Sequence, residues 1–271
     1  MTQIIAAICD NRKKIVALSD RMLTTRDLSL AFEHEEPKVE RVTEHCLALT
    51  AGSALRHYPI LRSVRGRYAN ITRPVRVEEI ARAIKEEYQR ARLEAVEDAI
   101  LRPRGLTLRE YREMQRTLHD AILMDIDRGM MNYNFDLHII VAGVDEEGGH
   151  IYYIANPGVM ESFDALGFCC VGTGDRYADA VFAYRRYNPS IDLKRALFIA
   201  YEAKKEAEMA GGVGPSTDIA IIDDKGIHML EQEIISKLDD IYREIKRRSS
   251  YEDEVIRKIE ALELSLKEDE E

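Results

Sequence analysis

The order of the apolar runs predicts an α+β layered sandwich, in which strands and helices come in separate blocks. Residues 1–52 have strand patterns, residues 53 to about 128 have helical patterns, and residues 137–171 have strand patterns again. Two more helices and a last strand follow. Strands and helices that alternate one by one would instead predict a parallel, doubly wound sheet, so the segregated order favours antiparallel sheets covered by helices.

The first block contains four strand signals. The apolar runs at 4–9 and 14–20 are joined by a short polar turn, which is typical of a β-hairpin. Residues 38–42 alternate between apolar and polar side chains, as a half-buried strand does. The continuous apolar run at 46–52 ends at a glycine. We therefore expect only strands between residues 1 and 52.

The apolar period changes at residue 53. Apolar side chains fall at helical spacing from 53 to about 71, and from 77 to 101 they form one stripe of a long amphipathic helix. A proline and a glycine interrupt this pattern, and a further helix is predicted at about 108–128, before Gly129.

The second half of the chain repeats the sequence of strands followed by helices. Turn residues rich in glycine, asparagine and acidic side chains separate its apolar runs. The expected elements are strands at 137–144, 150–155 and 163–171, helices at about 175–187 and 192–210, and a strand at 218–222.

Composition limits the classes of function. The 271 residues carry a formal net charge of −10, which disfavours nucleic-acid binding, and no apolar stretch approaches the roughly 20 residues of a membrane span. The apolar run before Asp10 is short and has no leading Lys or Arg, so we do not expect a signal peptide. Four cysteines without metal-ligand spacing predict neither a zinc site nor a disulfide scaffold, which favours a cytoplasmic protein without a metal or other cofactor.

Thr2 is the first candidate for catalysis. If Met1 were removed, Thr2 would carry a hydroxyl and an α-amine, whose pKa of about 7.7–8.0 lets it act as a general base at neutral pH. A threonine paired with its own N-terminal amine is a known activated nucleophile. The plainer interpretation is that Thr2 merely follows an initiator methionine.

Seven short segments stand in an order that favours the catalytic interpretation. They are Thr2–Ala6, Ala17–Thr24, Lys38–Val39, Leu49–Ser53, Ile140–Asp145, Val171–Asp175 and Gly214–Ala220. Through them, the chain from about Thr2 to Leu238 resembles the proteasome β-subunits, a family of N-terminal nucleophile (Ntn) hydrolases. The resemblance implies a four-layer αββα sandwich over 2–230. The helical block at 103–134 is longer than in the family and is expected to be an added insertion, and the pattern of 231–271 predicts an acidic helical extension.

The resemblance also implies a catalytic role for each matching residue. Thr2 corresponds to the nucleophile, and Asp20 to the acidic residue that pairs with a lysine and helps to hold the nucleophile. Lys38 corresponds to that lysine, whose charge lowers the pKa of the hydroxyl or the amine. Gly52 corresponds to the glycine whose N–H forms the oxyanion hole. Thr173 stands where the family usually has a serine that hydrogen-bonds to the terminal amine.

Substrate and partners follow from the same resemblance. Thr24 corresponds to a residue whose backbone pairs with an extended peptide, while Leu23, Thr50 and Ala54 would line the pocket beside the scissile bond. The implied substrate is a peptide or an unfolded protein, cleaved inside a homo-oligomeric ring that a regulatory ATPase could serve. The implied activity is that of a threonine peptidase.

Other interpretations remain open. Asp20 could be a strand-end residue paired with Lys13 or Lys14, and Lys38 could be an exposed charge on an alternating strand. The family has an acidic residue and a serine near the amine, whereas here Glu208 is offset and Val213 stands near the place of the serine. Maturation would need only the removal of Met1, and a retained Met1 would acylate the amine. The alternatives are therefore an inactive proteasome-like ring or scaffold, and an Ntn amidase or acyl transferase that acts on a small substrate.

Overall fold

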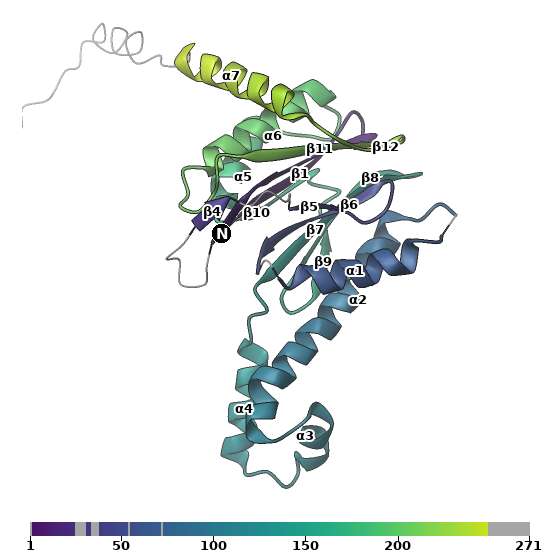
Figure 1. The fold of residues 1–271 in the computed structure, drawn as a ribbon, viewed down its shortest axis with the longest axis vertical. Helices are drawn as coiled ribbons and strands as arrows, with labels where there is room; N and C mark the ends of the chain where they lie inside the picture. Colours follow the sequence, from purple (N-terminus) through teal and green to yellow (C-terminus); the bar gives the residue numbers. More distant parts are fainter. Residues whose placement is uncertain (1, 25–30, 34–37, 54, 72, 249–271) are drawn as a thin grey trace, which may run out of the picture. The chain divides into compact units, whose positions relative to one another are not determined.

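Two five-stranded antiparallel sheets are stacked face to face at the centre of the fold, in the computed structural model (Figure 1). The structure describes residues 2–24, 31–33, 38–53, 55–71 and 73–248. The first sheet has the order β10-β1-β2-β11-β12, and the second has the order β5-β6-β7-β8-β9. The strands of the first sheet are β1 (Gln3–Cys9), β2 (Lys14–Asp20), β10 (Phe168–Gly172), β11 (Thr217–Asp223) and β12 (Gly226–Met229). Those of the second are β5 (Val39–Arg41), β6 (Cys46–Gly52), β7 (Leu137–Asp145), β8 (Gly148–Ala155) and β9 (Val159–Ser162).

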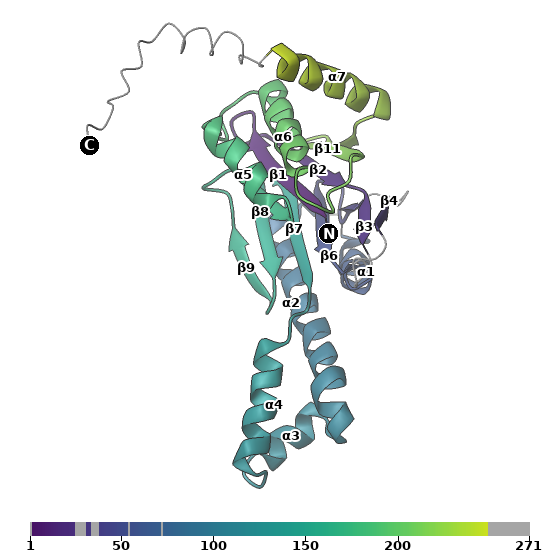
Figure 2. The same ribbon diagram turned by 90° about the vertical axis from the view of Figure 1, so that its left-hand side faces the viewer.

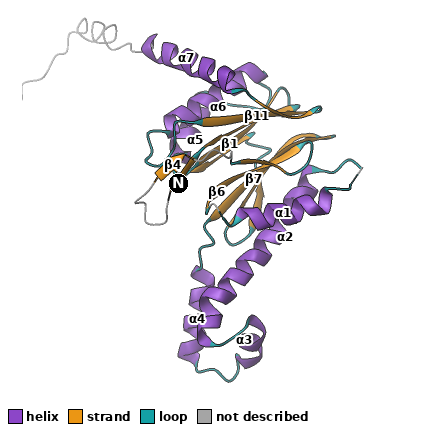
Figure 3. Ribbon diagram, viewed as in Figure 1, coloured by secondary structure: helices purple, strands orange, loops and turns teal. Residues whose placement is uncertain are grey.

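Helices cover the outer face of each sheet (Figure 3). Helices α5 (Asp175–Tyr184) and α6 (Leu193–Ala207) pack on the first sheet, where α5 contacts β10 and α6 contacts β1 and β2. Helices α1 (His57–Tyr68) and α2 (Val77–Val96) lie on the side of the second sheet, where α2 contacts β7, β8 and β9. The predicted four-layer αββα sandwich is confirmed.

The main core lies between the two sheets. Alternate residues of β1, namely Ile4, Ala6 and Ile8, point into it, and the intervening residues of the strand face the helices. Because both faces are covered, every residue of β1 is buried, which explains why this strand is an apolar run rather than an alternating pattern. Full burial of a large aliphatic side chain contributes about 1.5–3 kcal/mol of transfer free energy.

The helix expected at 108–128 is wrong, because two shorter helices occupy this part of the chain. Helix α3 (Leu108–Met114) begins at a capping box formed by Thr107 and Glu110. Helix α4 (Asp120–Asn132) begins at a second cap, where the ring of His119 accepts a hydrogen bond from the Ala121 amide. Gly129 does not end the helix. It lies inside α4, where an added Cβ would be 3.5 Å from the Ile100 side chain, an ordinary van der Waals distance that leaves room for alanine.

The strand expected at 163–171 is also wrong at its start. Strand β9 ends at Ser162 and β10 begins at Phe168, with a turn between them in which Gly167 has φ +82°. An ideal Cβ on Gly167 would lie 2.6 Å from Pro189, so only glycine fits there. The short strands β9 and β12 were not predicted, and neither was the two-stranded sheet of β3 (Met22–Thr24) and β4 (Ala31–Glu33).

A helical arm, residues 97–134, extends from the sandwich beyond α2 (Figures 1 and 2). It begins with a π-helical turn (Glu97–Leu101) and a 3₁₀ turn (Arg102–Arg104), continues through α3 and α4, and leads back to β7. The arm has its own small core, built on Leu101, Tyr111 and Ile126. At its base, the Arg92 guanidinium donates hydrogen bonds to the carbonyl oxygens of Met130 and Tyr133.

The chain divides into two compact units, Met1–Leu230 and Glu231–Glu271. The second unit contains helix α7 (Gln232–Arg248), and the rest of the helical extension expected at 231–271 lies outside the described residues. Within the described part of the chain, no helix has the length and apolar character that a membrane crossing requires.

Candidate active site

Thr2 lies immediately before β1 and is 4% exposed. Strand β10 fixes its backbone, because the Thr173 amide donates a hydrogen bond of 3.1 Å to the Thr2 carbonyl. Gly172 makes this approach possible: its φ is +143°, and a Cβ on it would lie 1.8 Å from the Thr2 oxygen. The predicted contact of the Thr173 hydroxyl with the terminal amine stays a prediction.

The Lys38 ammonium lies against the Thr2 hydroxyl. Its Nζ is 2.6 Å from Thr2 Oγ1 and 2.8 Å from Asp20 Oδ1, and it also donates to the Met22 carbonyl. These acceptors use all three donors of the ammonium. The Lys38 side chain is 10% exposed and that of Asp20 is fully buried. Lys38 is therefore not an exposed charge on an alternating strand.

Asp20 is held by donors from three parts of the chain. Its Oδ1 also accepts from the Gln3 amide at 3.0 Å, and its Oδ2 accepts from the amides of Gly214 at 2.9 Å and Met22 at 3.3 Å. A buried carboxylate requires such compensation. Lys14 pairs with Asp10 at 2.9 Å, rather than with Asp20.

Burial lowers the pKa of Lys38, and the neighbouring Asp20 carboxylate opposes that shift. A protonated amine beside a hydroxyl stabilises negative charge on its oxygen, which is what activation of a threonine nucleophile requires. The Asp20–Lys38 pair contacts the Thr2 hydroxyl as such activation would need, and the catalytic roles of the three residues stay predictions.

Two further ion-pair and hydrogen-bond contacts brace the surrounding strands. Arg21 forms a bidentate pair with Asp218 of β11, with distances of 2.9 Å and 2.5 Å. Glu33 of β4 accepts hydrogen bonds from the amide and the hydroxyl of Ser216, at 3.0 Å and 2.6 Å. The segment after Gly214 is therefore fixed to both β2 and β4.

Gly52 ends β6 in a conformation that other residues avoid. Its φ is +99°, and a Cβ would lie 2.4 Å from the Asp136 carbonyl oxygen. The same end of β6 is tied to the lysine, because the Thr50 amide donates to the Lys38 carbonyl at 3.3 Å. The oxyanion-hole role of the Gly52 N–H stays a prediction from the resemblance.

The residues expected to bind substrate are only partly placed. Leu23 and Thr24 belong to β3, where their backbones pair with Phe32 and Ala31. Thr50 is buried in β6. Ala54 lies outside the described residues. The substrate-binding roles stay predictions.

The sequence analysis missed Lys204 and Gly214. The Lys204 side chain is fully buried, and its Nζ donates to the carbonyl oxygens of Gly214 and Pro215 and to Glu208. A signal was present, since Lys204 continues the buried helical stripe of Ala196 and Ala200. Glu208 is bound by Lys204 at 2.6 Å and also by Lys205 at 2.7 Å.

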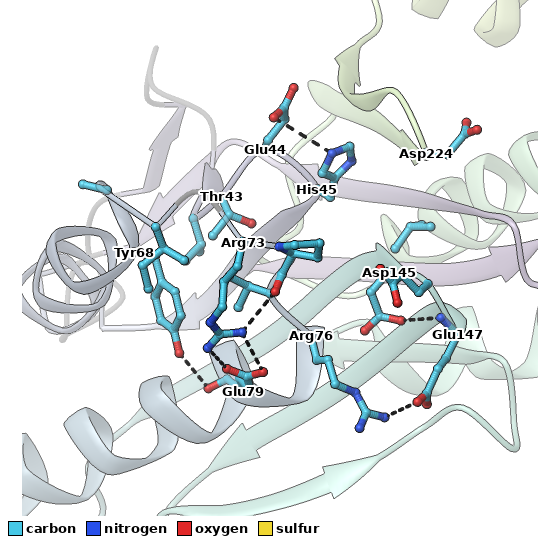
Figure 4. Close-up of a pocket in the computed structure, with 17 residues that line it drawn as sticks. Thr43, Glu44, His45, Tyr68, Arg73, Arg76, Glu79, Asp145, Glu147 and Asp224 are labelled. Atoms are coloured by element: carbon cyan, nitrogen blue, oxygen red, sulfur yellow. Dashed lines mark hydrogen bonds and ion pairs between the residues drawn. The ribbon is translucent and has the colours of Figure 1, made fainter.

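A cavity of about 950 Å³ lies at the other end of the second sheet (Figure 4). It is lined by residues just before β6 and just after β7, whereas Gly52 and Leu137 are paired at the opposite ends of these strands. Its side chains form surface ion pairs, such as Arg73 with Glu79 at 2.7 Å. Among the described residues, no group of three or more His, Cys, Asp and Glu side chains could hold a metal ion.

Comparison with known proteins gives two matches. Residues 107–222 match the family model described as "Proteasome subunit". Over 110 residues, the chain is 32% identical to "Proteasome subunit beta 1" of Korarchaeum cryptofilum (strain OPF8), and the match covers 40% of this chain and 50% of that protein. The chain thus spans about half the length of this curated relative. The family-model match includes Thr173 but not Thr2, Asp20 or Lys38.

Proposed function

We propose that this chain is a proteasome-like protein of the Ntn-hydrolase fold and that it acts as a threonine peptidase whose nucleophile is Thr2. One observation carries the proposal. The Lys38 ammonium lies 2.6 Å from Thr2 Oγ1 while it pairs with the buried Asp20 carboxylate. A fully compensated buried ion pair directed at a hydroxyl is the arrangement that activates a nucleophile.

The reaction uses groups of this chain alone. Thr2 Oγ attacks the carbonyl carbon of the scissile peptide bond, and its proton passes to the α-amine that processing before Thr2 would expose. The Gly52 N–H stabilises the oxyanion, an interaction worth about 3–4 kcal/mol of barrier. The C–N bond then breaks, and the leaving amine takes the proton. Water hydrolyses the resulting ester, releases the acid and returns the proton to Thr2 Oγ.

The proposed substrates are peptides or unfolded chains, and the proposed assembly is a homo-oligomeric ring. Support comes from the similarity to proteasome subunits and from β3, whose first residue, Met22, accepts a hydrogen bond from the Lys38 ammonium through its carbonyl oxygen. The four free cysteines agree with the reducing cytoplasm in which we place the protein. A regulatory ATPase is the further partner that this assignment suggests.

A second candidate is a ring or scaffold protein without catalysis. Glu208, the offset candidate for supporting the amine, hydrogen-bonds to Lys204 and Lys205. An amidase or acyl transferase for a small substrate is a third candidate. Light scattering distinguishes it from the peptidase by measuring the oligomeric state of the protein. A closed ring agrees with a peptidase that admits unfolded chains, whereas a monomer or dimer agrees with a small substrate.

Intact mass spectrometry tests the activity directly. The protein is measured before and after incubation with a peptide epoxyketone, which reacts with an N-terminal threonine. We expect a chain that begins at Thr2 and a single adduct, lost in Thr2→Ala and kept in Thr117→Ala, which removes an exposed threonine hydroxyl from the arm. A natively expressed chain that retains residues before Thr2 and forms no adduct would sink the peptidase and favour the scaffold.

A further inference from the structure

Helix α6 presents a buried lysine to the segment that backs the candidate site. The Lys204 side chain is fully buried, although lysine is almost never buried unless it is paired. Its ammonium has three donors, and all three are used: by Glu208 at 2.6 Å, Gly214 O at 2.9 Å and Pro215 O at 2.8 Å. The ammonium is therefore a fixed point between the end of α6 and the start of β11.

The segment that Lys204 holds reaches Asp20 directly. The Gly214 amide donates a 2.9 Å hydrogen bond to Asp20 Oδ2, while the Gly214 carbonyl accepts from Lys204. Gly214 is packed so closely that an added Cβ would lie 3.1 Å from the Met22 side chain. A shift of this segment would therefore change the positions of Asp20 and Met22.

Asp20 and Met22 are two of the three acceptors that hold Lys38. The third acceptor is the Thr2 hydroxyl. Two buried ammonium groups thus lie on the two sides of Asp20, since Lys38 contacts Oδ1 and Lys204 acts on Oδ2 through Gly214. Burial lowers the pKa of Lys204, and Glu208 and Asp20 are among the groups that raise it.

We propose that Lys204 is a positioning residue for the nucleophile: its ammonium fixes Gly214 and Pro215 through their carbonyl oxygens, so that the Gly214 N–H keeps Asp20 directed at Lys38. This inference rests on the proposed function, in which Lys38 activates Thr2. Lys204 itself touches neither substrate nor the reacting atoms. Its effect reaches the hydroxyl through Gly214, Asp20 and Lys38.

The structure indicates what changes when Lys204 is removed. Glu208 and the carbonyl oxygens of Gly214 and Pro215 each lose a donor, and these two residues lose their contact with α6. Asp20 is then less well positioned as the counter-ion of Lys38. Because Asp20 opposes the lowering of the Lys38 pKa by burial, that pKa should fall further. The other charges that raise the Lys38 pKa, those of Asp218 and Glu33, are unchanged by the substitution.

The test compares Lys204→Met with Lys194→Met, an exposed lysine on the same helix. In Lys204→Met we expect kcat for peptide hydrolysis to fall on the order of 10- to 100-fold, because small misplacements of reacting groups have effects of this size. KM should change little. The alkaline limb of the pH profile, where Lys38 loses its proton, should move to lower pH by about one unit. Lys194→Met should match the unaltered protein in all three.

A second readout does not depend on activity. The full chain is labelled at the lysine ε-carbons, the Lys38 signal is assigned from Lys38→Arg, and its titration is followed by NMR. A lower Lys38 titration midpoint in Lys204→Met supports the positioning role even if the unaltered protein hydrolyses no peptide. The absence of hydrolysis would count only against the peptidase function. Lys204→Gln, which keeps a donor for a segment carbonyl, serves if Lys204→Met does not fold. An unchanged Lys38 midpoint and kcat, with only a lower Tm, would overturn the positioning role.

Discussion

The two ends of the stacked sheets use charge in different ways. At the Thr2 end, the Lys38, Asp20 and Lys204 side chains are almost or fully buried, and each ammonium donor has an acceptor. At the other end, a cavity of about 950 Å³ is bordered by exposed ion pairs such as Arg73 with Glu79. This cavity thus lies away from the candidate site, which is marked by buried charge.

The two kinds of charge differ in how much unfolding free energy is lost when one partner is removed. A charge in the interior requires its partners, since the loss of one partner leaves the other uncompensated. A pair on the surface loses little because water replaces the partner. Three charge substitutions test this contrast, and Gly52→Ala tests the backbone at the Thr2 end; they follow in descending order of the expected effect.

Lys38→Met should have the largest effect. It leaves the buried Asp20 carboxylate without its cation, which costs about 3–5 kcal/mol of unfolding free energy. It also removes the charge beside Thr2, so epoxyketone labelling should slow by about 10³-fold or more. Urea unfolding and intact mass measure the two effects. Lys14→Met, which breaks a surface pair with Asp10, is the control, and equal losses in both variants would contradict the contrast.

Gly52→Ala should follow. The new methyl group would lie 2.4 Å from the Asp136 carbonyl, at a φ of +99° that alanine adopts only with strain. We expect a loss of about 1–3 kcal/mol in chemical unfolding. The control is Gly66→Ala inside α1, where nothing lies within 4 Å of the added Cβ. That change should stabilise the protein by about 0.5–1 kcal/mol. A Gly52→Ala variant as stable as the unaltered protein would show that the end of β6 does not require glycine.

His150→Gln tests a partly buried pair at the cavity end. Its Nδ1 lies 2.6 Å from Asp164, and this hydrogen bond, with the charges of Asp164 and Asp145, raises the His150 pKa although burial lowers it. A raised pKa stabilises the fold fully below the unfolded value of about 6.5, and this stability is lost as the pH rises through the folded value. The variant should therefore lose about 1–2 kcal/mol at pH 5.5 and clearly less at pH 9. Urea titrations at the two pH values check this, and a loss that grows with pH would contradict the assignment.

Arg73→Ala should have the smallest effect. The pair with Glu79 is largely exposed, so the change in unfolding free energy should be close to zero and should shrink further at high salt. Thermal unfolding at low and high salt measures it. A loss as large as that of Lys38→Met would mean that the cavity end is stabilised as the Thr2 end is.

The sequence predicted the parts that short-range patterns control. Apolar runs located β1, β2, β6 and β7, and the order of blocks predicted the sandwich. The contact of Lys38 with Asp20 was expected from the family resemblance, since residues 18 positions apart give no local signal. The buried stripe of α6 includes Lys204, but its contacts could not be predicted, because two of its acceptors are the backbone carbonyls of Gly214 and Pro215, which no side-chain pattern reveals. The break between α3 and α4 was missed because it depends on two caps rather than on hydrophobic period.

The helical arm has a consequence for how the chain opens. Its apolar centre, around Leu101, Tyr111 and Ile126, is closed within the arm, and the Arg92 hydrogen bonds join its return end to α2. We expect a segment with a separate core to open locally as a unit of its own, so that its amide protons exchange faster than those of the sheets. Proteolytic nicking between α3 and α4 should then leave the sandwich folded, with Lys38 still in contact with Thr2.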